Sequence, residues 1–231
     1  MASLSDSVTR GPRAMSLDSA LKRRLIAALA AAVIDNAEEL TALDRAIGDG
    51  DHGLNMKRGF EAVLADLDGL AEKPLPEMCK AIGTHLVMTI GGASGPLYGT
   101  LFLALGKNLP PTPVLTEAVR AFAAAVDAVK ARGRSDIGEK TMLDVLQPVA
   151  KTLEYVAAGG VGTDLISKLR DAADRGLEAT RPIRASKGRA SFLGERSIGH
   201  LDPGARSSQL LVHAACGVLS GLMVEAGGQS A

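Results

Sequence analysis

The sequence is poor in aromatic residues and carries no excess of charge of either sign. Aromatic residues make up 3% of its 231 residues, tryptophan is missing, and 26 basic side chains balance 26 acidic ones. Nucleic-acid binding therefore is not expected, because it uses either a broad basic surface or rows of aromatic rings on which bases stack.

Cysteines, long apolar runs and a signal-peptide core are also scarce or missing. The two cysteines, Cys79 and Cys216, lie in apolar, helix-like surroundings and predict reduced core thiols rather than a secreted disulfide framework. A membrane-spanning helix needs an uninterrupted apolar run of about 18 residues, and we find none. Residues 1–13 lack an apolar signal-peptide core, so the cytoplasm is the default location.

Alternation of polar and apolar residues, which is typical of strands, is absent too, and the remaining pattern is helical. Apolar residues recur at spacings of three and four, as in Leu21, Leu25, Leu29 and Val33. These spacings predict an all-α protein with eight helices joined by segments rich in glycine and proline. The expected helices cover residues 17–40, 54–71, 76–90, 96–107, 113–132, 139–158, 163–180 and 205–226.

The chain is long enough to form one large domain with a full core. No internal repeat is evident, and no linker separates two cores. We expect a single helical domain over residues 16–226, with Ser16 as the first N-cap. A disordered tail is expected at residues 1–15 and a frayed end at residues 227–231.

The most unusual segment is residues 43–56, LDRAIGDGDHGLNM, in which three carboxylates are interleaved with glycines. Asp44, Asp49 and Asp51 would repel one another at neutral pH unless a cation offsets their charge. Carboxylate oxygens favour Mg²⁺ or Ca²⁺, and Mg²⁺ commonly completes its coordination with water and phosphate oxygens. The alternative is a solvated turn in which Asp51 caps the next helix. The residues alone leave both interpretations open.

A second glycine-rich segment, residues 91–100, reads GGASGPLYGT and opens a helix. Backbone N–H groups at a helix N-terminus bind phosphates when no side chains hinder them, and Ser94 would add a hydroxyl donor. No Gly-Lys-Ser/Thr sequence follows, so the segment is not a Walker A loop. Close helix packing through small residues is the alternative.

Two further loops combine glycine with charge. Residues 132–144, RGRSDIGEKTMLD, place Met142 in the first turn of a helix, where its thioether contacts a planar base or fills the core. Residues 187–205, KGRASFLGERSIGHLDPGA, offer Arg189 as a bidentate clamp for phosphate and Asp202 as a helix cap. An ordinary surface loop before a capped helix is the alternative for this last segment.

Together these four segments resemble the nucleotide-binding L subunit of dihydroxyacetone kinase, which is also the C-terminal half of single-chain ATP-dependent dihydroxyacetone kinases. The likeness covers about residues 17–226. It implies eight antiparallel helices in a closed α-barrel, with ADP or ATP bound among the loops at one end. It also implies two Mg²⁺ ions with Asp44, Asp49 and Asp51 as ligands. The nucleotide contacts that it implies are His52, Gly53, Leu54, Asn55, Ala93, Ser94, Gly133, Met142, Arg189, Asp202, Pro203 and Gly204.

The resemblance further implies an incomplete kinase that passes phosphate from the nucleotide to dihydroxyacetone held on a separate K subunit. ADP would remain bound as a cofactor and be rephosphorylated by a phosphocarrier M subunit of the phosphotransferase system. Three alternatives stay open: exchange of ATP in a kinase for dihydroxyacetone or another short ketose, a regulatory module acting on a transcriptional regulator, and a structural Ca²⁺ site. No acid or base residue is assigned, and a homodimer is also left open.

Overall fold

The computed structural model describes residues 17–160 and 164–228, and within them every regular element is a helix. The all-α class expected from the sequence is therefore confirmed. The expectations for residues 1–15, for Ser16 and for residues 229–231 lie outside the described residues. The helices are α1 (Ser19–Ile34), α2 (Ala37–Ile47), α3 (His52–Ala65), α4 (Leu67–Glu72), α5 (Leu75–Thr89), α6 (Ser94–Asn108), α7 (Leu115–Gly133), α8 (Leu143–Ala157), α9 (Leu165–Ala179), the 3-10 helix η1 (Arg189–Ser197) and α10 (Pro203–Gly228).

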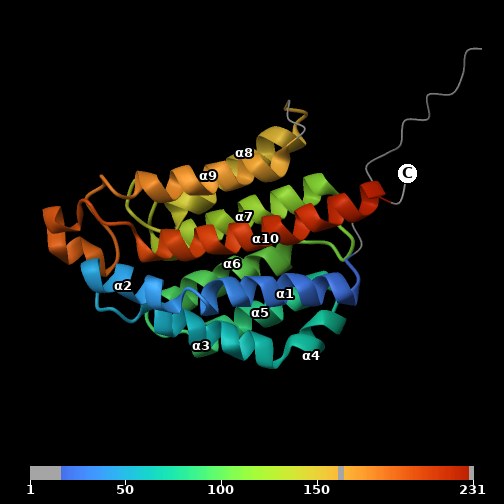
Figure 1. The fold of residues 1–231 in the computed structure, drawn as a ribbon, viewed down its shortest axis with the longest axis horizontal. Coiled ribbons are helices and arrows are strands. Elements are labelled where there is room, and N and C mark those ends of the chain that lie inside the picture. The colour runs from blue at the N-terminus through green and yellow to red at the C-terminus, as the bar shows by residue number, and fades with distance from the viewer. Residues whose placement is uncertain (1–16, 161–163, 229–231) are drawn as a thin grey trace, which may run out of the picture.

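Eight of these helices form a closed ring. In chain order α1, α3, α5, α6, α7, α8, α9 and α10 each pack against the next, and α10 returns to α1. Neighbouring helices run in opposite directions along the long axis of the molecule (Figure 1). This order of neighbours agrees with the eight-helix barrel that the resemblance implies.

Two of the eight expected helices are each divided in two. The first breaks at residues 35–36, where the side-chain amide of Asn36 donates to the carbonyl of Ala32 at 2.9 Å and competes with the helical hydrogen bonds. The second breaks at Asp66, the C-cap of α3 and N-cap of α4. A short polar side chain that bonds to the backbone explains the first break. At the second break the Asp66 carboxylate makes no capping hydrogen bond and lies 3.1 Å from Nε2 of His85 on α5. Apolar spacing alone predicted neither break.

A large apolar cluster fills the ring. It includes Phe60 of α3, Leu86 of α5, Tyr98 of α6 and Val126 of α7, all nearly inaccessible to solvent. Cys79 and Cys216 are buried free thiols, as the sequence predicts. Among the described residues no helix is long and apolar enough to cross a membrane.

Helices α5 and α6 approach each other closely through glycine. A Cβ atom on Gly106 would lie 2.5 Å from the carbonyl oxygen of Pro76, and one on Gly83 would lie 2.9 Å from that of Gly99. These distances leave no room for a side chain. The close contact fixes the direction in which α6 leaves the loop at residues 90–93.

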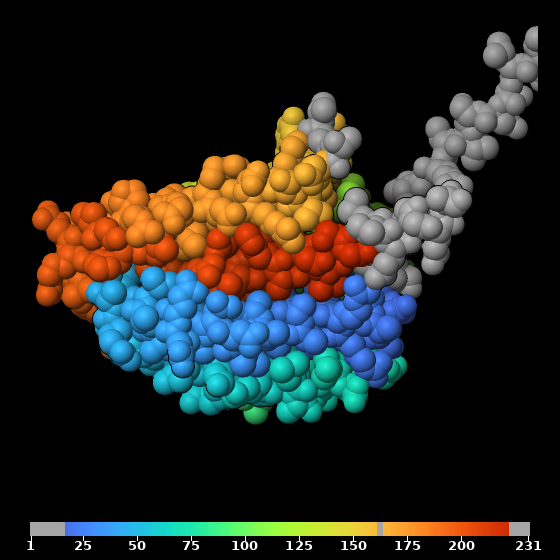
Figure 2. Space-filling view, viewed as in Figure 1, coloured from blue at the N-terminus to red at the C-terminus, as the bar shows by residue number. Residues whose placement is uncertain are grey.

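The antiparallel ring also decides where helices begin. Helices α3, α6, α8 and α10 all start at the same end of the ring, which is the left end in Figure 1. The positive ends of four helix dipoles therefore point toward one region. Residues 181–202 form the outermost part of that end, as the space-filling view shows (Figure 2).

Candidate functional site

The loops that precede these four helices enclose a cavity of about 730 Å³. A volume of this size suits a small molecule such as a nucleotide. The cavity is lined by most of the site residues expected from the sequence, although these are spread over 160 positions of the chain. Those that line it are Asp44, Asp49, Asp51, His52, Ala93, Ser94, Gly133, Met142, Arg189, Asp202, Pro203 and Gly204.

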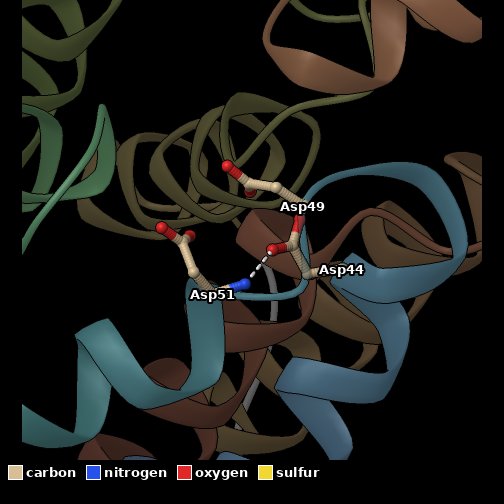
Figure 3. Close-up of side chains that lie close together, drawn as sticks. All are labelled: Asp44, Asp49 and Asp51. Carbon is tan, nitrogen blue, oxygen red and sulfur yellow. Dashed lines mark hydrogen bonds between the residues drawn. The ribbon is translucent and has the colours of Figure 1, made fainter.

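The three aspartates form one cluster on the cavity wall. Carboxylate oxygens from Asp44, Asp49 and Asp51 all lie within 4.8 Å of one another (Figure 3). Asp44 is buried at the end of α2, whereas the other two carboxylates are exposed. An all-oxygen donor set of this kind fits a hard divalent cation such as Mg²⁺.

Asp44, and not Asp51, accepts hydrogen bonds from the free backbone N–H groups at the start of α3. Its Oδ2 accepts hydrogen bonds from the backbone N–H of Asp51 at 2.8 Å and of His52 at 3.1 Å. Asp51 occupies the N-cap position, but its side chain makes no capping hydrogen bond. The capped-turn alternative for Asp51 is therefore wrong, and its carboxylate is available to the cluster.

Glycines shape the loop between α2 and α3. A Cβ atom on Gly48 would lie 2.2 Å from Oδ1 of Asp44, and Gly50 has a φ of +74°, which other residues rarely adopt. Arg189 of η1 reaches across to this loop, and its Nε lies 2.8 Å from Oδ2 of Asp49. The guanidinium thus offsets part of the negative charge, and it sits where an anionic ligand would meet the cluster.

The glycine loop between α5 and α6 forms the adjoining wall. Gly92 has a φ of +65° and open space around it, so its backbone is accessible from the cavity. Ser94 begins α6 and faces the same cavity. The open backbone and the helix N-terminus together suit an anion such as a phosphate.

Three expected nucleotide contacts do not line the cavity. A Cβ atom on Gly53 would lie 2.0 Å from the carbonyl oxygen of Ala37, so this glycine permits α3 to pack on α2. Leu54 is 64% exposed on the outer side of α3. Asn55 is buried and accepts a hydrogen bond from Arg58 at 2.7 Å.

Met142 lies at the start of α8 in an apolar part of the wall. It is 4% exposed and shares the cavity lining with Leu97 of α6 and Val129 of α7. Asp144 shapes the preceding loop, since its carboxylate accepts hydrogen bonds from the backbone N–H of Gly138 at 2.6 Å and of Thr141 at 2.7 Å. An apolar surface beside groups that suit a phosphate also suits a planar base.

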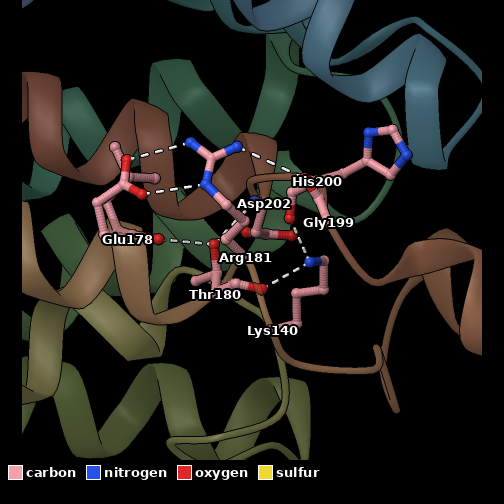
Figure 4. Close-up of polar contacts among 8 residues, drawn as sticks. Lys140, Glu178, Thr180, Arg181, Gly199, His200 and Asp202 are labelled. Carbon is pink, nitrogen blue, oxygen red and sulfur yellow. Dashed lines mark hydrogen bonds and ion pairs between the residues drawn. The ribbon is translucent and has the colours of Figure 1, made fainter.

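A buried lysine joins two of the loops. The ammonium group of Lys140, 1% exposed, donates to the carbonyl of Thr180 at 2.6 Å and to that of His200 (Figure 4). Its backbone is left-handed, with a φ of +63°. Burial lowers the pKa of the Lys140 ammonium, and the neighbouring Asp202 opposes this shift. The contacts hold the loop before α8 against the end of α9 and the loop before α10.

Asp202 caps the last helix, as expected from the sequence. Its Oδ2 accepts from the backbone N–H of Ala205 at 2.7 Å, and Pro203 is the first residue of α10. Burial raises the pKa of the Asp202 carboxyl to about 7, with the charge of Asp144 adding to the effect and that of Lys140 reducing it. This cap therefore carries its proton in weakly acidic solution.

His52 is buried at the floor of the cavity between two hydroxyl groups. Its Nδ1 lies 3.0 Å from Oγ of Ser94 and its Nε2 lies 2.9 Å from Oγ of Ser207. Burial lowers the pKa of His52, although Asp44 and Asp51 favour its charged form. The imidazole is therefore neutral at physiological pH.

Sequence reasoning missed several residues that support this site. Tyr98 lies in an apolar stretch of α6, and Ser207 lies among the polar residues at the start of α10; nothing in their spacing marks them as partners. Lys140 had a detectable signal, since it lies between glycine-rich and helical segments in one of the four motifs. Its interaction with two distant carbonyls depends on tertiary structure and could not be read from the chain.

Comparison with known families agrees with this geometry. The sequence profile of the DAK2 domain matches residues 46–217, which is most of the chain. The chain belongs to the DAK2 domain family. The matched region spans all four cavity loops and begins just after Asp44.

Relatives in the DAK2 domain family include two bacterial kinase subunits. The chain is 44% identical over 183 residues to the ADP-binding subunit DhaL of PEP-dependent dihydroxyacetone kinase 1 of Listeria innocua, covering 79% of this chain and 87% of that protein. It is 41% identical over 179 residues to the DhaL subunit of the PEP-dependent dihydroxyacetone kinase of Escherichia coli, covering 76% and 85%.

A solved structure shares the fold. The dihydroxyacetone kinase of C. freundii in complex with AMP-PNP and Mg²⁺ superimposes with a TM-score of 0.71 at 25% sequence identity. The match covers 94% of this chain and 37% of that longer chain. The helical ring is thus also part of a larger, single-chain kinase.

The raised pKa of Asp202 predicts a pH dependence of stability. Its folded pKa of about 7 exceeds the unfolded value of about 3.9, so its stabilising contribution is full below pH 4 and is lost as pH rises toward 7. Asp202→Asn keeps an acceptor for Ala205 and removes the titration. We expect the stability of the wild type, relative to this variant, to fall by roughly 1.4 kcal/mol per pH unit within that window.

Urea unfolding of both proteins at several pH values checks this prediction. Titratable groups that do not interact with Asp202 contribute equally to both proteins, so they cancel in the difference between them. Parallel stability curves for wild type and variant from pH 4 to pH 7 would contradict the assignment.

Proposed function

We propose that this chain is the nucleotide-binding, phosphoryl-transfer subunit of a dihydroxyacetone kinase. The observation that carries the proposal is the cavity, which is lined by an all-oxygen acidic cluster at the start of α3, by an open glycine loop and by the starts of α6, α8 and α10. The names of the L. innocua and E. coli relatives support an adenine nucleotide as the ligand.

Different residues of the cavity would hold the Mg²⁺ ions, the phosphates and the base of the nucleotide. Asp44, Asp49 and Asp51 would hold two Mg²⁺ ions, which neutralise phosphate charge when they are bound. Backbone N–H groups around Gly92 and the Arg189 guanidinium would hold phosphate oxygens. The apolar wall at Met142 would receive the base. Within this arrangement the protein contributes position and charge rather than an acid or base.

The acceptor would come from a partner subunit that carries dihydroxyacetone. Phe192 of η1 lines the mouth of the cavity and is 86% exposed. An exposed aromatic ring at the rim of a ligand site is typical of a surface that a partner covers. The cations Arg184 and Arg196 flank it in sequence and are also exposed, so the partner surface would be acidic around an apolar centre.

We further propose that ADP stays bound and is rephosphorylated by a phosphocarrier protein of the phosphotransferase system. The PEP-dependent relatives from L. innocua and E. coli support this mode. The chain also shares 37% identity over 221 residues with the D-erythrulose kinase of Mycolicibacterium smegmatis, of which it covers 37%. That longer relative favours, as a second candidate, an ATP-exchanging kinase for a short ketose.

Asp49→Asn tests the metal cluster. The variant keeps the shape of the side chain but removes one charge from the three carboxylates, so we expect Mg²⁺-dependent affinity for ADP to fall at least about tenfold. Calorimetric titration measures the affinity, and far-UV circular dichroism checks that the helices persist. Asp171→Asn, at an exposed position of α9, is the matched control. Unchanged affinity in Asp49→Asn would remove this residue from the site.

Turnover with a dihydroxyacetone-binding K subunit distinguishes the two donor modes. With ATP as the only donor, we expect one turnover per subunit at most, because ADP stays in the cavity. Adding the phosphocarrier and its upstream donor should restore continuous formation of dihydroxyacetone phosphate. Continuous turnover with ATP alone would contradict the retained-ADP mode and favour exchange.

A further inference from the structure

Helix α2 lies outside the ring of eight helices, yet it carries Asp44 of the acidic cluster. It has 11 residues, and its buried positions are Ala37, Leu40, Asp44 and Ile47. A carboxylate thus takes one of the few positions with which α2 packs on the rest of the protein. Polar contacts with neighbouring helices therefore also decide how α2 sits, and with it where the Asp44 carboxylate lies.

A bidentate ion pair joins α2 to the start of α10. Nε of Arg206 lies 2.9 Å from Oε1 of Glu39, and Nη2 of Arg206 lies 2.8 Å from Oε2 of Glu39. Two N–H···O bonds to one carboxylate fix the relative orientation of the side chains as well as their distance. The side chain of Arg206 is only 22% exposed, so solvent screens the pair less than it screens a fully exposed one.

The remaining guanidinium nitrogen of Arg206 is held as well. Nη1 donates to Oε1 of Gln209, which is 9% exposed, and Nε2 of Gln209 donates to Oδ1 of Asp174 on α9 at 2.5 Å. A change of the Arg206 rotamer would break contacts to α2 and to α10 together. Arg206 is thus a fixed point on the ring against which α2 is placed.

Arg206 is close in sequence to the cavity wall but is not part of the cavity lining. Pro203 and Gly204, which do line the cavity, precede it within the first turn of α10. Its partner Glu39 and the carboxylate of Asp44 lie on the same short helix, five residues or about 7.5 Å apart along the helix axis. A contact at Glu39 therefore sets the position of Asp44 relative to the start of α10.

We propose that Arg206, acting through Glu39 and helix α2, positions the Asp44 carboxylate within the acidic cluster. Arg206 is a positioning residue and not a contact of the ligand. Its effect on Asp44 is a property of the free protein, whereas the resulting effect on Mg²⁺ affinity rests on the proposed function.

Amide hydrogen exchange reports the position of Asp44 without any ligand. The backbone N–H groups of Asp51 and His52 both donate to Oδ2 of Asp44, so their exchange is slow while that carboxylate is in place. We expect Arg206→Gln to speed exchange at both amides at least about fivefold, because α2 loses its tie to α10. Exchange at the wild-type rate would overturn the proposal.

Arg23→Gln is the matched control for this experiment. Arg23 of α1 makes a similar pair of contacts with Asp68 and Glu72, at the opposite end of the ring (Figure 1). We expect both amides to keep their wild-type exchange rates in this variant. Equally fast exchange in Arg23→Gln would assign the effect to a general loss of stability and overturn the proposal.

Mg²⁺ titrations of Arg206→Gln and Glu39→Gln, followed by the amide signals of the acidic loop, test the effect on the cluster. Both variants should bind Mg²⁺ about fivefold more weakly, and the double variant no more weakly than Glu39→Gln, because the two residues act as one pair. Charge alone predicts the opposite for Arg206→Gln, since removing a cation strengthens the attraction for Mg²⁺.

Tighter or unchanged Mg²⁺ binding by Arg206→Gln would therefore contradict the proposal. A wild-type protein that binds no Mg²⁺ would instead contradict the proposed function. In that case amide exchange at Asp51 and His52 still decides whether Arg206 positions Asp44.

Discussion

The acidic loop depends on one interaction, the pair of hydrogen bonds that Asp44 accepts from the backbone of Asp51 and His52. These bonds satisfy the start of α3 with a side chain from the end of α2. Asp51 is thereby released from the capping role that its position suggests, and its carboxylate turns to Asp44 and Asp49. The Asp44 carboxylate thus both closes the turn and leaves the Asp51 carboxylate free to join the acidic cluster.

The closed ring supplies the rest of the site. Because neighbouring helices are antiparallel, alternate loops meet at one end, and each precedes a helix whose N-terminus is positive. The acidic cluster, at the start of α3, and the starts of α6, α8 and α10 therefore line one cavity. A ligand that combines cations with phosphates would interact favourably with both the carboxylates and the helix N-termini. A cation alone would suit only the carboxylates, and an anion alone only the helix N-termini.

Local sequence signals predicted the helical class and the cavity loops well. The glycines beside carboxylates at residues 48–51 predict a tight acidic loop, and Asp202 before Pro203 predicts a helix start. Both predictions depend only on residues close together in the sequence. The breaks within two expected helices lie at Asn36, whose side chain competes for a backbone carbonyl, and at Asp66, whose side chain contacts His85, and apolar periodicity does not register either residue.

The supporting interactions were harder to predict because they join distant segments. Lys140 reaches Thr180 and His200, and His52 reaches Ser207, only after the ring has closed. Three residues assigned with the acidic motif, Gly53, Leu54 and Asn55, lie outside the cavity lining because α3 turns them toward α2, solvent and Arg58. Proximity in sequence to a motif does not place a side chain in a site.

We propose that the acidic end of the ring holds a nucleotide together with divalent cations. Native mass spectrometry of the purified chain, before and after addition of Mg²⁺ and ADP, tests it most directly. We expect an added mass equal to one ADP and two Mg²⁺ ions, with ADP released on denaturation. The mass of the polypeptide alone, unchanged at a large excess of Mg²⁺ and ADP, would contradict it.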